Sequence, residues 1–193
     1  NFQCLELKNK LMKFNVPCQI KNKQNIFDTE ASRLLVLFLD SLLNPRLLKN
    51  LNLLATSKFI EIDVEEFIDY QISKKLETLT KQCITWSKEL AEKGFLTLVN
   101  ELIIYYDSSS INCDEHLNSN LFQLSEIIEI ELINNDFNLN KVFKWYQNQL
   151  DDSLRTCTGE DYLTKDNNLQ KGINLSTIHN SKGLEYDVVL CPY

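Results

Sequence analysis

Apolar residues recur at every third or fourth position through the middle of the chain. The series consists of Val64, Ile68, Ile72, Leu76, Leu79, Cys83, Trp86 and Leu90. This spacing places all of them on one face of an α-helix, which has 3.6 residues per turn. We therefore expect one long amphipathic helix, or two with a break near Tyr70, ending at Lys93-Gly94, because glycine suits the backbone of a helix C-terminus.

Similar spacings predict helices along most of the remaining chain. They cover Phe2 to Phe14, Asp28 up to Asn44-Pro45, residues 46–60, Phe95 to Tyr106, Leu117 to Leu132 and Asn138 to Leu150. Asp28 and Asn138 are typical N-cap residues. The run from Leu34 to Leu39 is apolar on all sides, which predicts a helix buried on several faces. Four Gly and three Pro are too few for the many turns of a β-sandwich or barrel.

The two ends of the chain differ from this helical middle. Short strands are predicted near residues 17–21, 173–178 and 187–191, the last being the apolar run Val188-Val-Leu-Cys. Residues 151–172 are mostly polar and predict a mobile linker. The expected fold is therefore mostly α with a small α/β part.

Charge limits what this chain binds by itself. Its formal net charge is −7, and phosphate binding needs local Lys and Arg, so we do not expect it to hold nucleic acid by charge alone. A small basic cluster consists of Lys8, Lys10, Lys13, Lys21 and Lys23. Such a run is usually a solvated helix face, with nucleic-acid contact as the alternative.

The cysteines argue against a metal or redox motif. No two of the six lie closer than 14 positions, so the chain has no CxxC pair. Neither a signal peptide nor a run of 18 apolar residues is present in the sequence, and we expect reduced thiols in a cytoplasmic protein. The sequence starts at Asn1 rather than at Met, and we expect it to be a piece of a longer protein.

The groups best suited to chemistry gather between residues 176 and 186. Thr177, His179, Lys182, Gly183 and Glu185 follow directly on a predicted strand, the usual place for ligands in open α/β sheets. Thr177, His179 and Lys182 suit phosphate, and Glu185 suits a sugar hydroxyl. The alternative is an ordinary solvated turn, with Gly183 present for its backbone freedom.

Other candidate sites are weaker. His116 stands alone at a helix start and is expected on the surface. Asp151-Asp152 has no third acidic residue nearby, so we expect no metal site there. Trp86 and Trp145 are expected in the core. A phosphate loop of the form GxxxxGKS or GxxxxGKT is absent from the sequence, so this chain is not a complete P-loop ATPase.

Two segments resemble one known family. Thr177-Ile-His-Asn-Ser-Lys-Gly-Leu-Glu-Tyr, followed by the apolar run at Val188, resembles motif V of superfamily 1 DNA helicases. Upstream, Val16-Pro-Cys, then Asn25-Ile-Phe-Asp-Thr-Glu-Ala, resembles the stretch after motif IV of the UvrD-type members. Within that group, Phe27-Asp-Thr-Glu-Ala and Leu53-Leu-Ala-Thr-Ser look closest to the beta subunit of exodeoxyribonuclease V, the RecB type.

This resemblance implies a domain layout. Residues 1–45 would belong to the second RecA-like motor domain, residues 46–168 would form a helical 2B-like insertion, and residues 169–193 would return to the motor domain with motif V. The insertion would thus be flanked by a remnant of a RecA-like parallel sheet. The resemblance implies that the parent is an ATP-dependent DNA helicase and exonuclease. This chain lacks the phosphate loop, the Mg²⁺-binding acidic motif, the arginine motifs and the nuclease domain. We therefore expect this chain alone to be inactive, with no catalytic residue and no bound cofactor.

The resemblance also implies roles for the candidate residues. Glu185 would accept hydrogen bonds from the ribose hydroxyls of ATP, and Gly183 would allow close approach of the backbone. Thr177, His179 and Lys182 would contact single-stranded DNA. In the parent, ATP and Mg²⁺ would be the cofactors. Its partners would be single-stranded DNA at motif V, duplex DNA near the insertion and other subunits of a helicase–nuclease complex in DNA repair and recombination, with no membrane.

Two other functions compete with this interpretation. The first is a non-enzymatic helical protein-interaction module whose C-terminal part only imitates the motif. The second is a small hydrolase with His179 as its base. No Ser or Cys nucleophile is placed beside His179 by the sequence, which disfavours the hydrolase.

Overall fold

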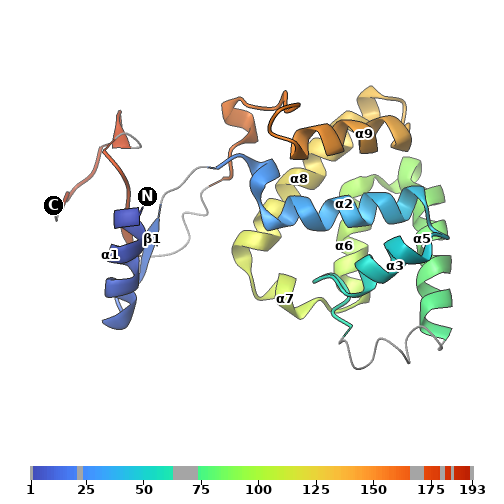
Figure 1. The fold of residues 1–193 in the computed structure, drawn as a ribbon, viewed down its shortest axis with the longest axis horizontal. Helices are drawn as coiled ribbons and strands as arrows, with labels where there is room; N and C mark the ends of the chain where they lie inside the picture. Colours follow the sequence, from blue (N-terminus) through green and yellow to red (C-terminus); the bar gives the residue numbers. More distant parts are fainter. Residues whose placement is uncertain are drawn as a thin grey trace. The chain divides into compact units, whose positions relative to one another are not determined.

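The chain folds into two compact units in a computed structural model that describes residues 2–20, 24–62, 74–165, 172–178, 181–183 and 185–191 (Figure 1). Unit 1 combines Asn1–Lys23 with Asp166–Tyr193, and unit 2 is Gln24–Lys165. The mostly helical fold with a small α/β part is confirmed. Within the described ranges, no helix is both long and apolar enough to cross a bilayer.

The described residues of unit 2 are helical apart from loops and one isolated β-bridge. Its elements are η1 (Ile26–Asp28), α2 (Glu30–Leu43), α3 (Leu48–Ala55), α5 (Lys74–Lys93), α6 (Phe95–Tyr105), α7 (Ser109–Asn112), α8 (Glu115–Asn134), α9 (Leu139–Leu150) and η2 (Glu160–Tyr162). The predicted helices are confirmed with small shifts at their ends, except that the helix predicted over residues 46–60 ends already at Ala55. The first part of the long predicted helix, residues 63–73, lies outside the described residues.

Helix α2 is the centre of unit 2, as its apolar run predicts. It packs against α3, α5, α8 and α9 (Figure 1). Phe38 is fully buried, and its ring lies 6.2, 5.7 and 5.8 Å from the rings of Phe59, Trp86 and Phe95. Burying one such side chain contributes about 1.5–3 kcal/mol, so this aromatic cluster is a main source of stability. Trp86 is a core residue, as expected.

Glycine 94 turns the chain sharply between α5 and α6. Its φ is +81°, a conformation that favours glycine, and a Cβ there would lie 2.6 Å from a carboxylate oxygen of Glu129. That carboxylate accepts a hydrogen bond of 3.0 Å from the backbone N–H of Leu96 and so caps α6. The predicted stop at Lys93-Gly94 is confirmed.

The predicted N-caps have different outcomes. The Asn138 side chain caps α9 by accepting from the Lys141 N–H, as predicted. Asp28 is not the N-cap of α2, so that prediction is wrong: the N-cap is Thr29, and Asp28 lies in η1. The reason is that Asn25 caps η1 by accepting from the Phe27 N–H, which delays the start of α2.

Residues 151–165 form a packed segment, which we call the clasp. The prediction of a mobile linker is wrong for these residues, while residues 166–171 lie outside the described part. The buried Gln149 side chain accepts hydrogen bonds of 3.0 Å from the N–H groups of Thr156 and Cys157. Arg155 donates to the Gln149 carbonyl at 2.7 Å and pairs with Asp28 and Asp152 at 2.7 and 2.9 Å. Several of the polar residues that suggest a linker, among them Asp152, Arg155 and Thr156, therefore make contacts within unit 2.

The clasp also joins the two ends of unit 2. The Thr164 N–H donates to the Gln24 carbonyl at 2.9 Å, and Asn25 forms an antiparallel bridge with Leu163. The Gln123 side chain of α8 donates to the Leu163 carbonyl at 2.9 Å and accepts from the Lys165 N–H at 3.2 Å. The chain therefore enters and leaves unit 2 at neighbouring points.

Unit 1 contains α1 (Phe2–Lys13), β1 (Cys18–Ile20) and β2 (Ile173–Leu175), with β1 and β2 paired in parallel. The predicted strands near 17–21 and 173–178 are confirmed, although both are shorter. The third predicted strand is wrong, because residues 187–191 form no strand. A strand needs a neighbour for its backbone hydrogen bonds, and the described residues place none there; Val188 and Leu190 are 78% and 80% exposed.

The unit boundaries differ from the predicted domain boundaries. The units meet at residues 23–24 and 165–166, so α2 packs inside unit 2. The boundaries at 45–46 and 168–169 concern domains of a larger protein and stay predictions.

The clasp generates a first prediction. Arg155→Met keeps the length of the side chain but removes the hydrogen bond to Gln149 and both ion pairs. We expect the free energy of unfolding to fall by about 1–3 kcal/mol, because hydrogen bonds made by charged groups are among the stronger ones. Urea unfolding followed by Trp fluorescence measures this. The control is Lys81→Met, which breaks an ion pair with Glu77 whose partners are 73% and 63% exposed. Equal effects of the two changes would contradict the structural role of Arg155.

Candidate functional site

The first part of the upstream resemblance, Val16-Pro-Cys, lies in unit 1 beside the strand that precedes Thr177, whereas its second part, from Asn25, belongs to unit 2. Cys18 pairs with Ile173, and Ile20 pairs with Leu175, in the parallel ladder of β1 and β2. The ladder is extended by a hydrogen bond of 2.9 Å from the Ile173 N–H to the Pro17 carbonyl. The segment at Val16-Pro17-Cys18 therefore lies beside the strand that leads into residues 176–186.

Glycine 172 permits this close pairing. A Cβ at this position would lie 2.5 Å from the Pro17 carbonyl oxygen and 2.9 Å from the Pro17 carbonyl carbon. Both are backbone atoms, so they cannot move aside as a flexible side chain would. Only glycine fits at this position without displacing β1 from β2.

A compact turn follows β2. The Ser181 N–H donates to the carbonyls of Thr177 and Ile178 at 3.1 and 3.3 Å, and the Ser181 hydroxyl donates to Thr177 at 3.1 Å. Thr177 and Ser181 are both half-buried. The Thr177 carbonyl is therefore held by the turn, while its hydroxyl makes no hydrogen bond with the described residues and is available to a ligand.

The other predicted site residues lie at or after this turn. Lys182, Gly183 and Glu185 are exposed, and His179 lies outside the described residues. Gly183 has a φ of +80°, and nothing lies within 4 Å of a Cβ built there. Backbone conformation, not crowding within this chain, therefore requires glycine at position 183. The structure brings Thr177, Lys182 and Gly183 into one turn, with Glu185 two residues beyond it.

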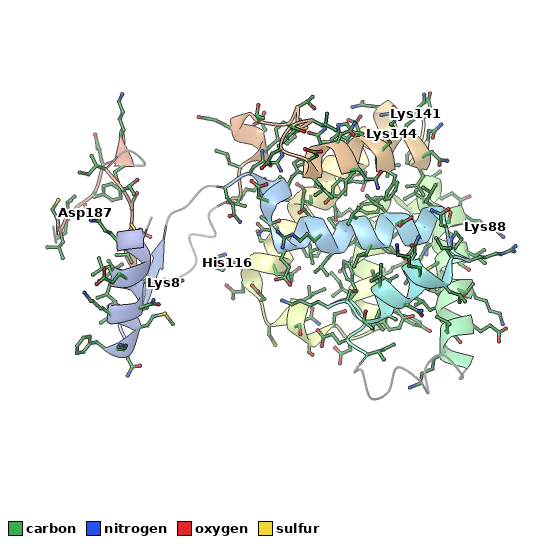
Figure 2. All side chains as sticks on the ribbon, in the orientation of Figure 1. Lys8, Lys88, His116, Lys141, Lys144 and Asp187 are labelled. Carbon is green, nitrogen blue, oxygen red and sulfur yellow. The ribbon has the colours of Figure 1, made fainter. Side chains whose placement is uncertain are left out.

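The charged groups around the turn determine which parts of a ligand each of them can contact. Lys182 is one cation near two exposed carboxylates, Glu185 and Asp187, the latter labelled in Figure 2. An ammonium and a hydroxyl donate to phosphate oxygens, whereas a carboxylate only accepts and suits sugar hydroxyls. The arrangement can thus contact both parts of a nucleotide or nucleic acid, but its net charge does not attract phosphate.

Elsewhere, side chains fit structural roles. His116 is exposed near the start of α8 (Figure 2), as expected. Asp152 pairs with Arg155, and Asp151 accepts from Ser153. Hydrogen bonds from the backbone and side chain of Ser153 lower the pKa of the Asp151 carboxyl. Trp145 is half-buried against Phe27, with ring centroids 6.0 Å apart. Among the described residues, no three potential ligands gather into a metal site.

The thiols and the basic cluster are equally unremarkable chemically. All six cysteines are free, and burial raises the pKa of the Cys83 thiol to about 12, which makes it unreactive. Within the basic cluster, Lys10 and Lys13 are exposed and Lys8 is half-buried on α1, while Lys21 and Lys23 lie outside the described residues.

Sequence reasoning missed two residues that shape the site. Gly172 sets the approach of β2 to β1, and Ser181 closes the turn. A glycine directly before a predicted strand is a signal for close backbone contact and could have identified Gly172. The role of Ser181 depends on a turn that the alternation of polar and apolar residues does not specify.

Known proteins resemble this chain along its whole length. The RecBCD enzyme subunit RecB of Buchnera aphidicola subsp. Baizongia pistaciae is 26% identical over 212 residues, covering 100% of this chain and 17% of that protein. The subunits named RecB of Buchnera aphidicola subsp. Acyrthosiphon pisum and of Chlamydia trachomatis serovar D are each 25% identical, covering 97% and 91% of the chain. No protein-family model matches. The chain spans about a sixth of the length of these curated relatives, and the similarity supports a RecB-like relationship.

The contact at Gly172 generates a second prediction. Gly172→Ala should push β2 away from β1, because the new methyl group meets backbone atoms. We expect exchange of the Ile173 amide hydrogen to accelerate at least tenfold, since its bond to Pro17 is lost, while amides in α8 are unaffected. NMR-detected hydrogen exchange measures both. The matched control is Gly159→Ala, where nothing lies within 4 Å of the added Cβ. Unchanged protection of Ile173 would contradict the steric argument.

Proposed function

We propose that this chain is part of an ATP-dependent DNA helicase of the RecB kind that acts in recombinational DNA repair. The observation that carries the proposal is the pairing of β1 with β2, which brings the chain after Val16-Pro-Cys beside the strand that leads into the motif-V-like turn, across residues 24–165. Similarity to proteins named RecB along the whole chain supports it.

The roles proposed for individual residues follow from their chemistry. Glu185 accepts hydrogen bonds from the ribose hydroxyls of ATP, and the left-handed backbone at Gly183 positions it. Thr177, His179 and Lys182 contact phosphates of a single DNA strand. When bound to the parent, ATP supplies free energy through the transfer of its terminal phosphoryl group. Because the described residues form no metal-ligand group, we assign no Mg²⁺ site to this chain.

One short segment then connects nucleotide and DNA. The Thr177 carbonyl is bonded to Ser181, which is followed directly by Lys182 and Gly183. A shift of residues 183–185 on nucleotide binding is transmitted through this turn to Thr177. A nucleotide that binds one position of the turn more tightly than another shifts the turn toward that position. The contacts with DNA then change, so the ATP state is coupled to strand binding.

The proposed activity also requires the helical unit and other parts of the parent. We propose that the helical unit lies near duplex DNA, that other subunits of a cytoplasmic helicase–nuclease complex bind the parent, and that this chain alone has no activity. A non-enzymatic interaction module would be insensitive to changes at Glu185, and this distinguishes the two functions.

The third prediction concerns the isolated chain. A single hydrogen bond accepted by a carboxylate contributes about 1.5–3 kcal/mol, which is less than the about 4 kcal/mol or more that association costs. We therefore expect a Kd for ATP above about 1 mM. Titration with a fluorescent ATP analogue measures this. Micromolar binding would show that the chain carries a nucleotide site that the proposal does not include.

The fourth prediction concerns the parent protein. Glu185→Ala should mainly raise the KM for ATP, while Thr177→Ala and His179→Ala should mainly reduce DNA-stimulated ATPase activity and unwinding. Each effect should be about tenfold, the loss of one charge-assisted hydrogen bond. Asp187→Asn is the matched control, an exposed carboxylate next to the same turn. Full helicase activity in a Glu185→Ala, His179→Ala double variant would overturn the assignment.

A further inference from the structure

A groove lies between α8 and η2 in unit 2, and the proposed function does not use it. Its volume is about 370 Å³. Gln123, Glu126, Ile127 and Ile130 line it from α8, and Glu160 and Asp161 line it from η2. Gln123 and Ile127, and likewise Glu126 and Ile130, are four positions apart, so the four residues share one helix face.

On α8, the aliphatic lining of this groove consists of Ile127, which is half-buried, and Ile130, which is 60% exposed. Ile133, about one turn further along α8 and outside the groove lining, is 57% exposed. On the opposite side of the same helix, Leu121, Leu124, Ile128 and Leu132 are fully or almost fully buried in the core of unit 2. Helix α8 thus has two apolar faces, and only one is covered within the described part of the chain.

The rim of the groove is acidic. Glu126, Glu160 and Asp161 surround the aliphatic floor, and Lys165 is the cation among the lining residues. Lys165 Nζ lies 3.7 Å from Glu126, while Glu160 and Asp161 form no ion pair with any described residue. Two carboxylates at this rim are therefore left to attract a positive charge.

The groove is already formed without a partner. Gln123 holds the η2 side of the groove to α8 by its bonds to Leu163 and Lys165, and Asn25 bridges to Leu163. Tyr162 points its ring at Phe27, with ring centroids 6.3 Å apart, and so anchors η2 to the core. A site held in place in this way loses little conformational entropy when it is occupied.

We propose that this groove binds a basic, aliphatic segment of a partner protein. The methylene stem of an Arg or Lys side chain lies on Ile127 and Ile130, and its cation reaches Glu160 and Asp161, since long basic side chains bury their stems while keeping the charge in a polar environment. A nucleic acid does not fit, because its phosphates would face three carboxylates. This inference is independent of the helicase assignment, because it rests on unit 2 alone.

The full 193-residue chain with ¹³C-labelled isoleucine methyl groups tests the proposal. The probe is the peptide acetyl-Leu-Arg-Leu-Arg-Leu-amide, and the comparison peptide has Glu in place of Arg. We expect saturable NMR shifts of the Ile127 and Ile130 methyl groups with the basic peptide only. The shifts should weaken in 0.5 M NaCl, because exposed ion pairs are screened by salt.

Matched variants separate the groove from general charge attraction. Glu160→Gln with Asp161→Asn should weaken binding about fivefold, or about 1 kcal/mol at 1.4 kcal/mol per tenfold change, as expected from the loss of exposed ion pairs. Glu92→Gln with Asp107→Asn changes the net charge equally at exposed positions outside the groove and should leave binding unchanged. No saturable shift, equal binding of the acidic peptide, or equal effects of the two double variants would overturn the proposal.

Discussion

The closure of unit 2 at its two ends is the constraint on which the rest of the structure depends. Parallel strands cannot be joined by a tight hairpin, so the chain between β1 and β2 has to make a crossover, and here that crossover contains a whole helical unit. An inserted unit of this kind leaves its neighbours undisturbed only if its ends lie together. The bonds from Thr164 to Gln24 and from Arg155 to Asp28 bring them together, and the ion pair gives the buried Arg155 side chain a charged partner.

The geometry of the candidate site depends on the pairing of β1 with β2. Because β2 pairs directly with β1, the turn at Thr177 starts from a fixed strand end, and Ser181 is held to it by hydrogen bonds to the Thr177 carbonyl. The hydrogen bonds that hold the site therefore come from unit 1, and the site depends on unit 2 only through its closed ends. The groove beside α8 depends on the clasp more directly, since the clasp segment itself, held by Gln123, forms one wall. One set of polar contacts thus closes the insertion and also shapes a surface.

Local patterns in the sequence predict local structure here, and contacts between distant residues account for the failures at the clasp and at residues 187–191. The periodic helices, the Asn138 cap and the turn at Gly94 follow from residues within a few positions of one another. The clasp resembled a linker because the partner of Arg155, Asp28, is 127 positions away. The strand expected at 187–191 depends on a neighbour that its own residues do not specify. Of the site, the sequence indicates which chemical groups gather near Thr177, but not the contact of Gly172 with Pro17 that positions them.

The groove beside α8 and the turn after β2 carry different charges, and they therefore suit different partners. A net charge of −7 opposes phosphate binding wherever carboxylates stand free of cations, which is the situation at Glu160 and Asp161. At the turn after β2, the phosphate-directed groups are a hydroxyl and one ammonium, with Glu185 suited to sugar hydroxyls instead. Such a turn binds nucleotide or DNA only when further cations are supplied by other protein segments. The acidic groove needs no such help to attract a basic partner. The proposed groove in unit 2 can therefore bind a basic partner without other protein segments, whereas the nucleotide contact proposed for unit 1 requires cations from outside the turn.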